Sequence, residues 1–201
     1  MVYNWGVETY ITLAANLLSL AGSYFIVRLD WKRYGALFLA SGLTGLILCY
    51  IFVKTGLYSF PYRLFPQISV MPFESVLTFF PFLVVAGVRY SPRNWAYKIP
   101  FYWAFVHVGM LGETLAQTYT GLIKYRFGWD FWDSYTWWWI FLLVFEWAGS
   151  LLIPVHLRKP LDQEAFRYGK WAWAVFHFIV ILTIFLGGYY FGLVSAGSFS
   201  Y

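Results

Sequence analysis

Three glutamates lie within long apolar stretches of the sequence, where acidic side chains are rare: Glu74, Glu113 and Glu146. An isolated carboxylate in hydrocarbon is costly, so each must be protonated, hydrogen-bonded or in contact with water. No Lys or Arg lies within any of the spans assigned below, so we expect none of the three to have a basic partner at its own depth. Acids in this setting are typical of proton-transfer and ligand sites, and we predict these three as the catalytic residues.

The composition of the chain requires a lipid environment for the elements that carry these acids. Of 201 residues, 61% are hydrophobic and 11% are charged, whereas soluble proteins average about 25% charged residues. Six apolar stretches are each long enough for a helix to cross about 30 Å of hydrocarbon. We therefore predict an all-α, polytopic membrane protein with one domain over residues 1–201. Its six spans are expected at about residues 8–27, 35–53, 71–88, 99–123, 136–157 and 171–193.

The positive charges alternate between the predicted connections. The first, third and fifth connections hold ten Lys and Arg residues, and the second and fourth hold four. Because Lys and Arg collect in cytoplasmic loops, we expect the odd-numbered connections to face the cytoplasm and both termini to lie outside. The net charge of +5 therefore indicates orientation in a membrane, and we expect no nucleic-acid partner.

Glu113 and Glu146 are predicted to meet near the middle of the membrane. Each lies about 15 Å from the outer end of its predicted span, at a rise of about 1.5 Å per residue. Consecutive spans are usually neighbours, so we expect these two carboxyls to face each other. Glu74 lies near the start of the third span, and it reaches the same site if the proline-rich segment 59–72 dips into the membrane.

Polar and aromatic side chains near the acids are predicted to contact a ligand. Gln117 lies one turn after Glu113 and Ser150 lies one turn after Glu146, so each can hydrogen-bond the carboxyl on its own helix face. Tryptophan rings inside the spans can stabilise a cation. The predicted ligand-contacting residues are Asn16, Trp103, His107, Gln117, Trp139, Trp147 and Ser150.

Several other chemistries lack their sequence patterns. Neither a Glu-x-x-His nor a His-Glu-x-x-His spacing is present, so we predict no metal site. No predicted span holds a lysine that would bind retinal, and no glycine loop would cradle a phosphate, so we expect no cofactor. The expected partner is a membrane lipid or an apolar small molecule, and a homo-oligomer is left open.

The stretch from Met71 to Phe80 resembles the proline-x-Glu-Glu motif of the membrane lycopene cyclase domains, with Pro72-Phe73-Glu74 as the matching residues. Ser75 replaces the second acid of that motif, so the resemblance implies a proton-donating role for Glu74 alone. The chain as a whole, with Gly112-Glu113-Thr114 and Phe145-Glu146-Trp147, is similar to a family of six-span membrane proteins of spore-forming bacteria. This similarity implies a multi-pass protein of the bacterial plasma membrane.

The sequence leaves three classes of function open. The first is acid-catalysed isomerisation or cyclisation of an isoprenoid or another lipid, with Glu146 and Glu113 as the proton donor and its orienting partner and Glu74 assisting. The second is proton- or cation-coupled transport of a small solute through the same carboxyls. The third is non-catalytic binding of a lipid or a partner.

Overall fold

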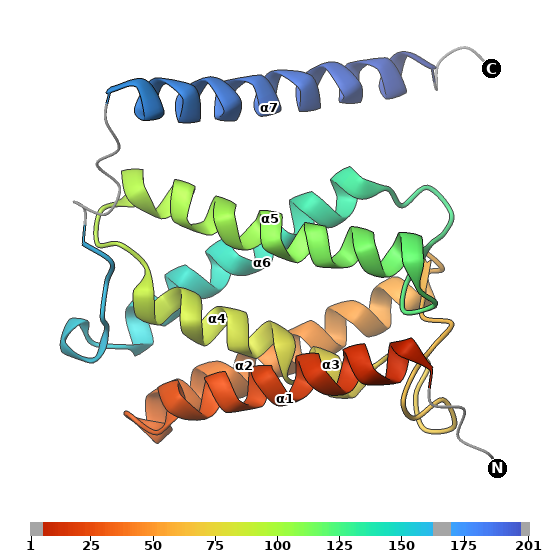
Figure 1. Cartoon of the computed structure of the whole chain (residues 1–201), viewed down its shortest axis with the longest axis horizontal. Helices are drawn as coiled ribbons and strands as arrows, with labels where there is room; N and C mark the ends of the chain where they lie inside the picture. Colours follow the sequence, from red (N-terminus) through yellow and green to blue (C-terminus); the bar gives the residue numbers. More distant parts are fainter. Residues whose placement is uncertain (1–5, 163–169, 198–201) are drawn as a thin grey trace. The chain divides into compact units, whose positions relative to one another are not determined.

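The computed structural model describes residues 6–162 and 170–197 and divides into two units, Met1–Pro160 and Leu161–Tyr201. The described elements are helices (Figure 1), apart from one pair of two-residue strands. The second unit contains one described helix, α7, at Lys170–Gly197. The elements of the first unit are α1 (Val7–Val27), α2 (Trp31–Lys54), β1 (Tyr58–Ser59), α3 (Phe73–Val76), α4 (Phe79–Tyr90), α5 (Trp95–Tyr119), β2 (Lys124–Tyr125), α6 (Phe131–Leu152) and the 3₁₀ helix η1 (Val155–Leu157).

Helix α4 forms the centre of the first unit, where it packs against α1, α2 and α6, and α5 packs against α6. Close approach of the helices depends on glycines at three of these contacts. A Cβ atom at Gly22 would lie 2.4 Å from the Phe82 ring, and one at Gly149 would lie 2.5 Å from Val88. Gly109 leaves similar room for the indole of Trp138, which a Cβ would approach to 2.9 Å.

Three helices begin before the predicted starts of their spans, because polar residues cap them, namely α2 at Trp31, α5 at Trp95 and α6 at Phe131. Asn94 caps α5 by accepting a hydrogen bond from the backbone N–H of Ala96, so this helix begins at Trp95 and not near residue 99. Asp130 and Asp133 form a capping box that starts α6 at Phe131 instead of residue 136. At its other end α6 stops at Leu152, before Pro154, so the predicted span 136–157 is displaced toward the N-terminus.

The third predicted span is broken into α3 and α4. The break covers Leu77 and Thr78, and the Thr78 hydroxyl donates hydrogen bonds to the Glu74 carbonyl and to the Asn16 side chain, both at 2.9 Å. Pro81 lies in the first turn of α4, where its missing N–H costs no hydrogen bond. Glu74 therefore lies on a short helical segment separate from α4.

Residues 58–72, called the strap here, cross the end of the bundle between α2 and α3. Strand β1 in the strap pairs antiparallel with β2, with Tyr58 opposite Tyr125. The backbone N–H of Tyr62 donates to the carbonyl of Gly121 at 2.8 Å, and the Tyr62 hydroxyl lies 2.6 Å from the Thr9 hydroxyl. The strap is therefore attached both to α1 and to the connection between α5 and α6, at the end that we call the β1–β2 end (Figure 1, right).

The distribution of side chains in α1 is the reverse of that in a water-soluble helix. Its buried face is polar and small, whereas Leu17 and Leu18 are 65% and 73% exposed. Within the part of the chain that the structure describes, three segments are long and apolar enough to cross a membrane, namely Val7–Val27, Trp31–Lys54 and Phe73–Tyr90. These features favour insertion in a membrane, and the six-span arrangement stays a prediction.

Candidate functional site

A cavity of about 430 Å³ lies at the β1–β2 end of the first unit. Helices α1, α2, α5 and α6, the start of α4, α3 and the strap all contribute to its walls, which are mostly apolar and aromatic. Two of the three predicted acids, Glu74 and Glu113, line this cavity together. The structure thus brings part of the predicted acidic site together.

Glu74 enters the cavity from α3 with both carboxyl oxygens unsatisfied. The two oxygens are buried, and neither has a hydrogen-bond partner among the residues that the structure describes. A buried polar atom without a partner is costly, so a carboxyl left in this state is either neutral or awaits a donor from outside the chain.

Glu113, on α5, is fully engaged by neutral donors. Its Oε1 atom accepts hydrogen bonds from the hydroxyls of Tyr125 at 2.7 Å and Ser134 at 2.6 Å, and its Oε2 atom accepts from the indole of Trp138 at 2.8 Å. Three donors and no acceptor are the surroundings of an ionised carboxylate. Burial, followed by the charge of Glu113, raises the pKa of Tyr125 above its usual range, so this phenol keeps the proton that it donates.

Two further polar side chains line the cavity, one of them predicted. Asn16 on α1 is buried, it lines the cavity with the two acids, and its Oδ1 atom accepts from Thr78. Arg63 in the strap donates from Nη1 to the carbonyl of Phe60, while its buried Nε has no partner among the described residues. Arg63 was not predicted, because the sequence places it in a connection and not in a span.

Two groups of aromatic rings form the cavity walls. In the first, Phe80 stacks on Trp138 with ring centroids 5.0 Å apart, and Phe141 meets Phe80 edge to face at 5.7 Å. In the second, Phe52 lies 4.9 Å from the rings of both Trp129 and Trp137. The hydrogen bond from Trp138 to Glu113 fixes the indole of the first group against the carboxylate.

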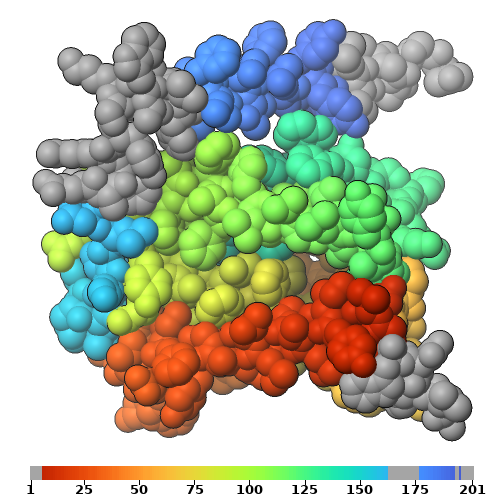
Figure 2. All heavy atoms as spheres, in the orientation of Figure 1, coloured from red at the N-terminus to blue at the C-terminus, as the bar shows by residue number. Residues whose placement is uncertain are grey.

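The cavity reaches the surface between α1 and α5. Among its lining residues on these helices, Ile11 and Gly112 are exposed, and Ala15 and Ala116 are small and half-buried. Figure 2 shows a hollow here between the red surface of α1 and the green surface of α5, with more distant atoms visible through it. Because the third span is broken here, α4 does not fill the space between the two helices.

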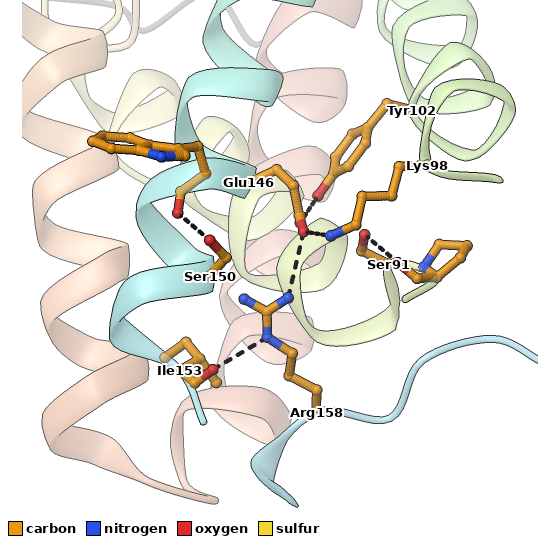
Figure 3. Close-up of polar contacts among 9 residues, drawn as sticks. Ser91, Lys98, Tyr102, Glu146, Ser150, Ile153 and Arg158 are labelled. Carbon is orange, nitrogen blue, oxygen red and sulfur yellow. Dashed lines mark hydrogen bonds and ion pairs between the residues drawn. The ribbon is translucent and has the colours of Figure 1, made fainter. Parts of the chain in front are cut away.

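Glu146 does not belong to this cavity, and the expectation that it lacks a basic partner is wrong. It is fully buried, and its carboxylate pairs with Lys98 and, at 3.4 Å, with Arg158 (Figure 3). The Tyr102 hydroxyl donates to its second oxygen at 2.5 Å. Lys98 lies in the first turn of α5 and not in a loop, which is why its side chain reaches Glu146.

The predicted contact between Glu113 and Glu146 is wrong for a geometric reason. Helix α5 brings Tyr102 to Glu146, and Glu113 lies about 16 Å further along that helix at a rise of about 1.5 Å per residue. The partners of Glu113 on α6 are Ser134 and Trp138, in the first half of that helix. Two separate polar sites therefore occupy opposite ends of the α5–α6 pair.

Six of the seven predicted ligand-contacting residues lie outside the described lining of the cavity. Gln117 is half-buried and leaves Glu113 to other donors, while Ser150 is exposed and donates to the Trp147 carbonyl at 2.6 Å. The Trp147 side chain itself is 60% exposed. His107 is exposed and packs on the Trp103 ring at 4.3 Å, and Trp139 is half-buried on α6.

Comparisons with known proteins do not assign a function to this cavity. No protein-family model, no curated protein and no solved structure matches the chain. Within residues 6–162 and 170–197, no three or more His, Cys, Asp or Glu side chains are grouped as a metal site would require. The site is therefore interpreted from its own geometry.

Proposed function

We propose that this protein binds an apolar, lipid-soluble molecule in the cavity that Glu74 lines. The observation that carries the proposal is the pair of buried Glu74 oxygens, which face the cavity without a partner among the described residues. Ligand pockets typically combine apolar walls with a few unsatisfied polar groups that fix the orientation of the ligand. The volume of about 430 Å³ lies within the usual range for such pockets, about 300–1,000 Å³.

The position of the opening supports a ligand that comes from the bilayer. The outer faces of the two helices that border the hollow are apolar, with Leu18 on α1 73% exposed and Leu111 on α5 61% exposed. A molecule dissolved in hydrocarbon would reach the hollow directly, whereas a water-soluble solute would have to cross these apolar faces.

The proposal is tested by extraction of ligands from the full-length protein purified from its native membrane. Mass spectrometry is expected to find an apolar molecule at a fixed ratio to wild-type protein. Gly112→Leu is expected to reduce it strongly, since a Cβ at this lining residue has open space and the added side chain takes up cavity volume. Gly188→Leu, also in a helix and with open space, is the matched control. If Gly112→Leu and Gly188→Leu retain the same apolar molecule in the same amount, the proposal is contradicted.

A second candidate function is acid catalysis on an alkene, which one observation favours. Glu74 is the cavity acid that no described donor holds, so it can carry a transferable proton. As a neutral acid it would give that proton to one carbon of a double bond, leaving a carboxylate and a carbocation beside the aromatic walls. Return of a proton from a neighbouring carbon to Glu74 would form a new double bond, so the product would have the mass of the substrate.

Incorporation of deuterium from the solvent into a lipid product would distinguish catalysis from binding alone. Wild-type protein incubated with a membrane lipid extract in D₂O is expected to yield an isomer that carries deuterium. Glu74→Gln should abolish this product, and Glu8→Gln, at the same end of the bundle but outside the cavity lining, should retain it. Binding without deuterium incorporation would contradict catalysis and would leave only the binding proposal.

Transport through all three carboxyls has less support, because Glu146 is held in an ion pair away from the cavity.

A further inference from the structure

The charges that face the cavity do not balance. Glu74 and Glu113 contribute two carboxyls, and Arg63 contributes one guanidinium. Neither cavity acid forms an ion pair with another of the described residues. With both acids ionised the cavity carries a net charge of −1.

The hydrogen-bond donors around Glu113 stabilise the negative charge that this carboxylate contributes to the cavity. All three of its donors are neutral groups, the hydroxyls of Tyr125 and Ser134 and the indole of Trp138, so they stabilise a carboxylate without cancelling its charge. Arg63 lies in the strap and donates to the carbonyl of Phe60, which directs one of its nitrogens to the backbone. The field in the cavity therefore favours a positive group near Glu74.

The aromatic walls favour the same sign of charge. The faces of aromatic rings attract cations, and tryptophan does so most strongly. Phe80 and Trp138 form one wall, and the hydrogen bond from the indole to Glu113 places a carboxylate at the edge of that wall. A small metal ion fits these walls poorly, since hard cations require several oxygen ligands, whereas an alkylated ammonium is matched to ring faces and one carboxylate.

We infer that the ligand of this cavity is an organic ammonium cation with an apolar chain or ring system, whose charged group meets Glu74. This inference rests on the proposed function and adds the chemical class of the ligand. Wild-type protein should prefer an ammonium amphiphile over a neutral amphiphile of the same length by at least about tenfold.

The test uses the intrinsic tryptophans as reporters, since Trp129, Trp137 and Trp138 line the cavity. Full-length protein in phosphatidylcholine vesicles is titrated with 12-bromododecyltrimethylammonium, 12-bromododecanol or 12-bromododecyl sulfate, because bromine quenches tryptophan fluorescence on contact. The probes are compared at equal mole fraction in the bilayer. The expected result is saturable quenching by the ammonium probe at about one tenth of the mole fraction that the alcohol requires, with weaker binding still for the sulfate.

Variants of the charged residues have opposite expected signs. Glu74→Gln should remove the preference for the ammonium probe, and Arg63→Gln should increase it, because a repelling charge is lost. Glu8→Gln should leave the preference unchanged. A residue with only a structural role would not produce a gain in Arg63→Gln, so this variant keeps the test decisive if Glu74→Gln fails to fold.

The outcomes separate this inference from the proposed function. Equal saturable quenching by the ammonium and alcohol probes would overturn the ammonium inference while the cavity still bound an apolar ligand. A preference for the sulfate would also overturn it and would assign the head group to Arg63. Absence of saturable quenching with every probe would contradict the proposed function itself.

Discussion

Glu113 and Glu146 are both buried carboxylates, but the protein satisfies them by different chemistry. Glu113 accepts three hydrogen bonds from neutral donors, whereas Glu146 compensates the positive charges of Lys98 and Arg158. Removal of the first acid leaves unsatisfied donors, and removal of the second leaves buried charges. Substitution of Glu113 and substitution of Glu146 should therefore lower the free energy of unfolding by different amounts. A second substitution that removes a partner's charge should recover stability only for Glu146.

Glu146→Gln is expected to lower the free energy of unfolding by about 3 kcal/mol, because two buried cations lose their counter-charge. Addition of Lys98→Met to this variant should recover part of the loss, since one of the unpaired charges disappears. The measurement is reversible unfolding in mixed detergent micelles followed by circular dichroism. If the double variant instead loses the sum of the two single losses, the pair is not coupled as the structure indicates.

Glu113→Leu is expected to destabilise the protein more than Glu113→Gln, by about 1–3 kcal/mol, in the same unfolding measurement. The amide oxygen of Gln can still accept hydrogen bonds from Tyr125 and Ser134, whereas Leu leaves all three donors without an acceptor. Equal stability of the two variants would show that the donors find other acceptors.

At the scale of elements, the lengths of apolar runs predicted the existence of the helices better than their ends. The first helix agrees closely with the predicted span 8–27, whereas α2 begins four residues before the predicted start of the span 35–53. The starts of α5 and α6 were missed because hydropathy treats their polar and aromatic first turns as loops, although Asn94 and the pair Asp130 and Asp133 are recognisable caps.

The error in helix ends explains the error in the acidic site. A predicted start of α5 near residue 99 puts Lys98 in a loop, and a predicted start of α6 near residue 136 puts Glu146 at mid-membrane opposite Glu113. The approach of Glu74 to Glu113 is predicted only on the condition that segment 59–72 dips into the membrane, and both side chains line the cavity. The donors to Glu113 depend on side-chain directions across three elements, and no spacing in the sequence contains that information.

The packing of α4 on α6 gives a test at this scale. Gly149→Ala is expected to lower the free energy of unfolding by about 1–3 kcal/mol, because its Cβ would lie 2.5 Å from a methyl group of Val88, which is fully buried. Gly35→Ala in α2 is the matched control, since its Cβ meets neighbours at the ordinary distance of 3.9 Å. The control should be neutral or raise stability by about 0.5–1 kcal/mol. Thermal unfolding in detergent of both variants measures the difference.

At the scale of the whole molecule, the exposed apolar side chains and the three apolar segments favour a membrane protein. The orientation in the membrane remains a prediction from the distribution of Lys and Arg. Helix α2 is the best element on which to test it, because Lys32 and Lys54 are both exposed and lie at its opposite ends.

In a Cys49→Ser background, Lys54→Cys is expected to react with a membrane-impermeant maleimide in intact cells. Lys32→Cys should react only after permeabilisation, because the positive-inside rule places the first connection in the cytoplasm. The reversed pattern would invert the predicted topology. Labelling of both variants in intact cells would show that α2 does not span the membrane.

Cys49 is the single cysteine of the sequence, and it is a buried part of the cavity wall beside Tyr58. The native chain therefore contains a single thiol that can be chemically modified at the place where the proposed ligand would bind. A small, membrane-permeant alkylating reagent that enters the cavity would meet this thiol, and a bound ligand would block it, so the rate of modification should report whether the cavity is occupied. Protein with a bound ligand should be modified slowly, and release of the ligand should increase the modification rate in proportion to the fraction of empty protein.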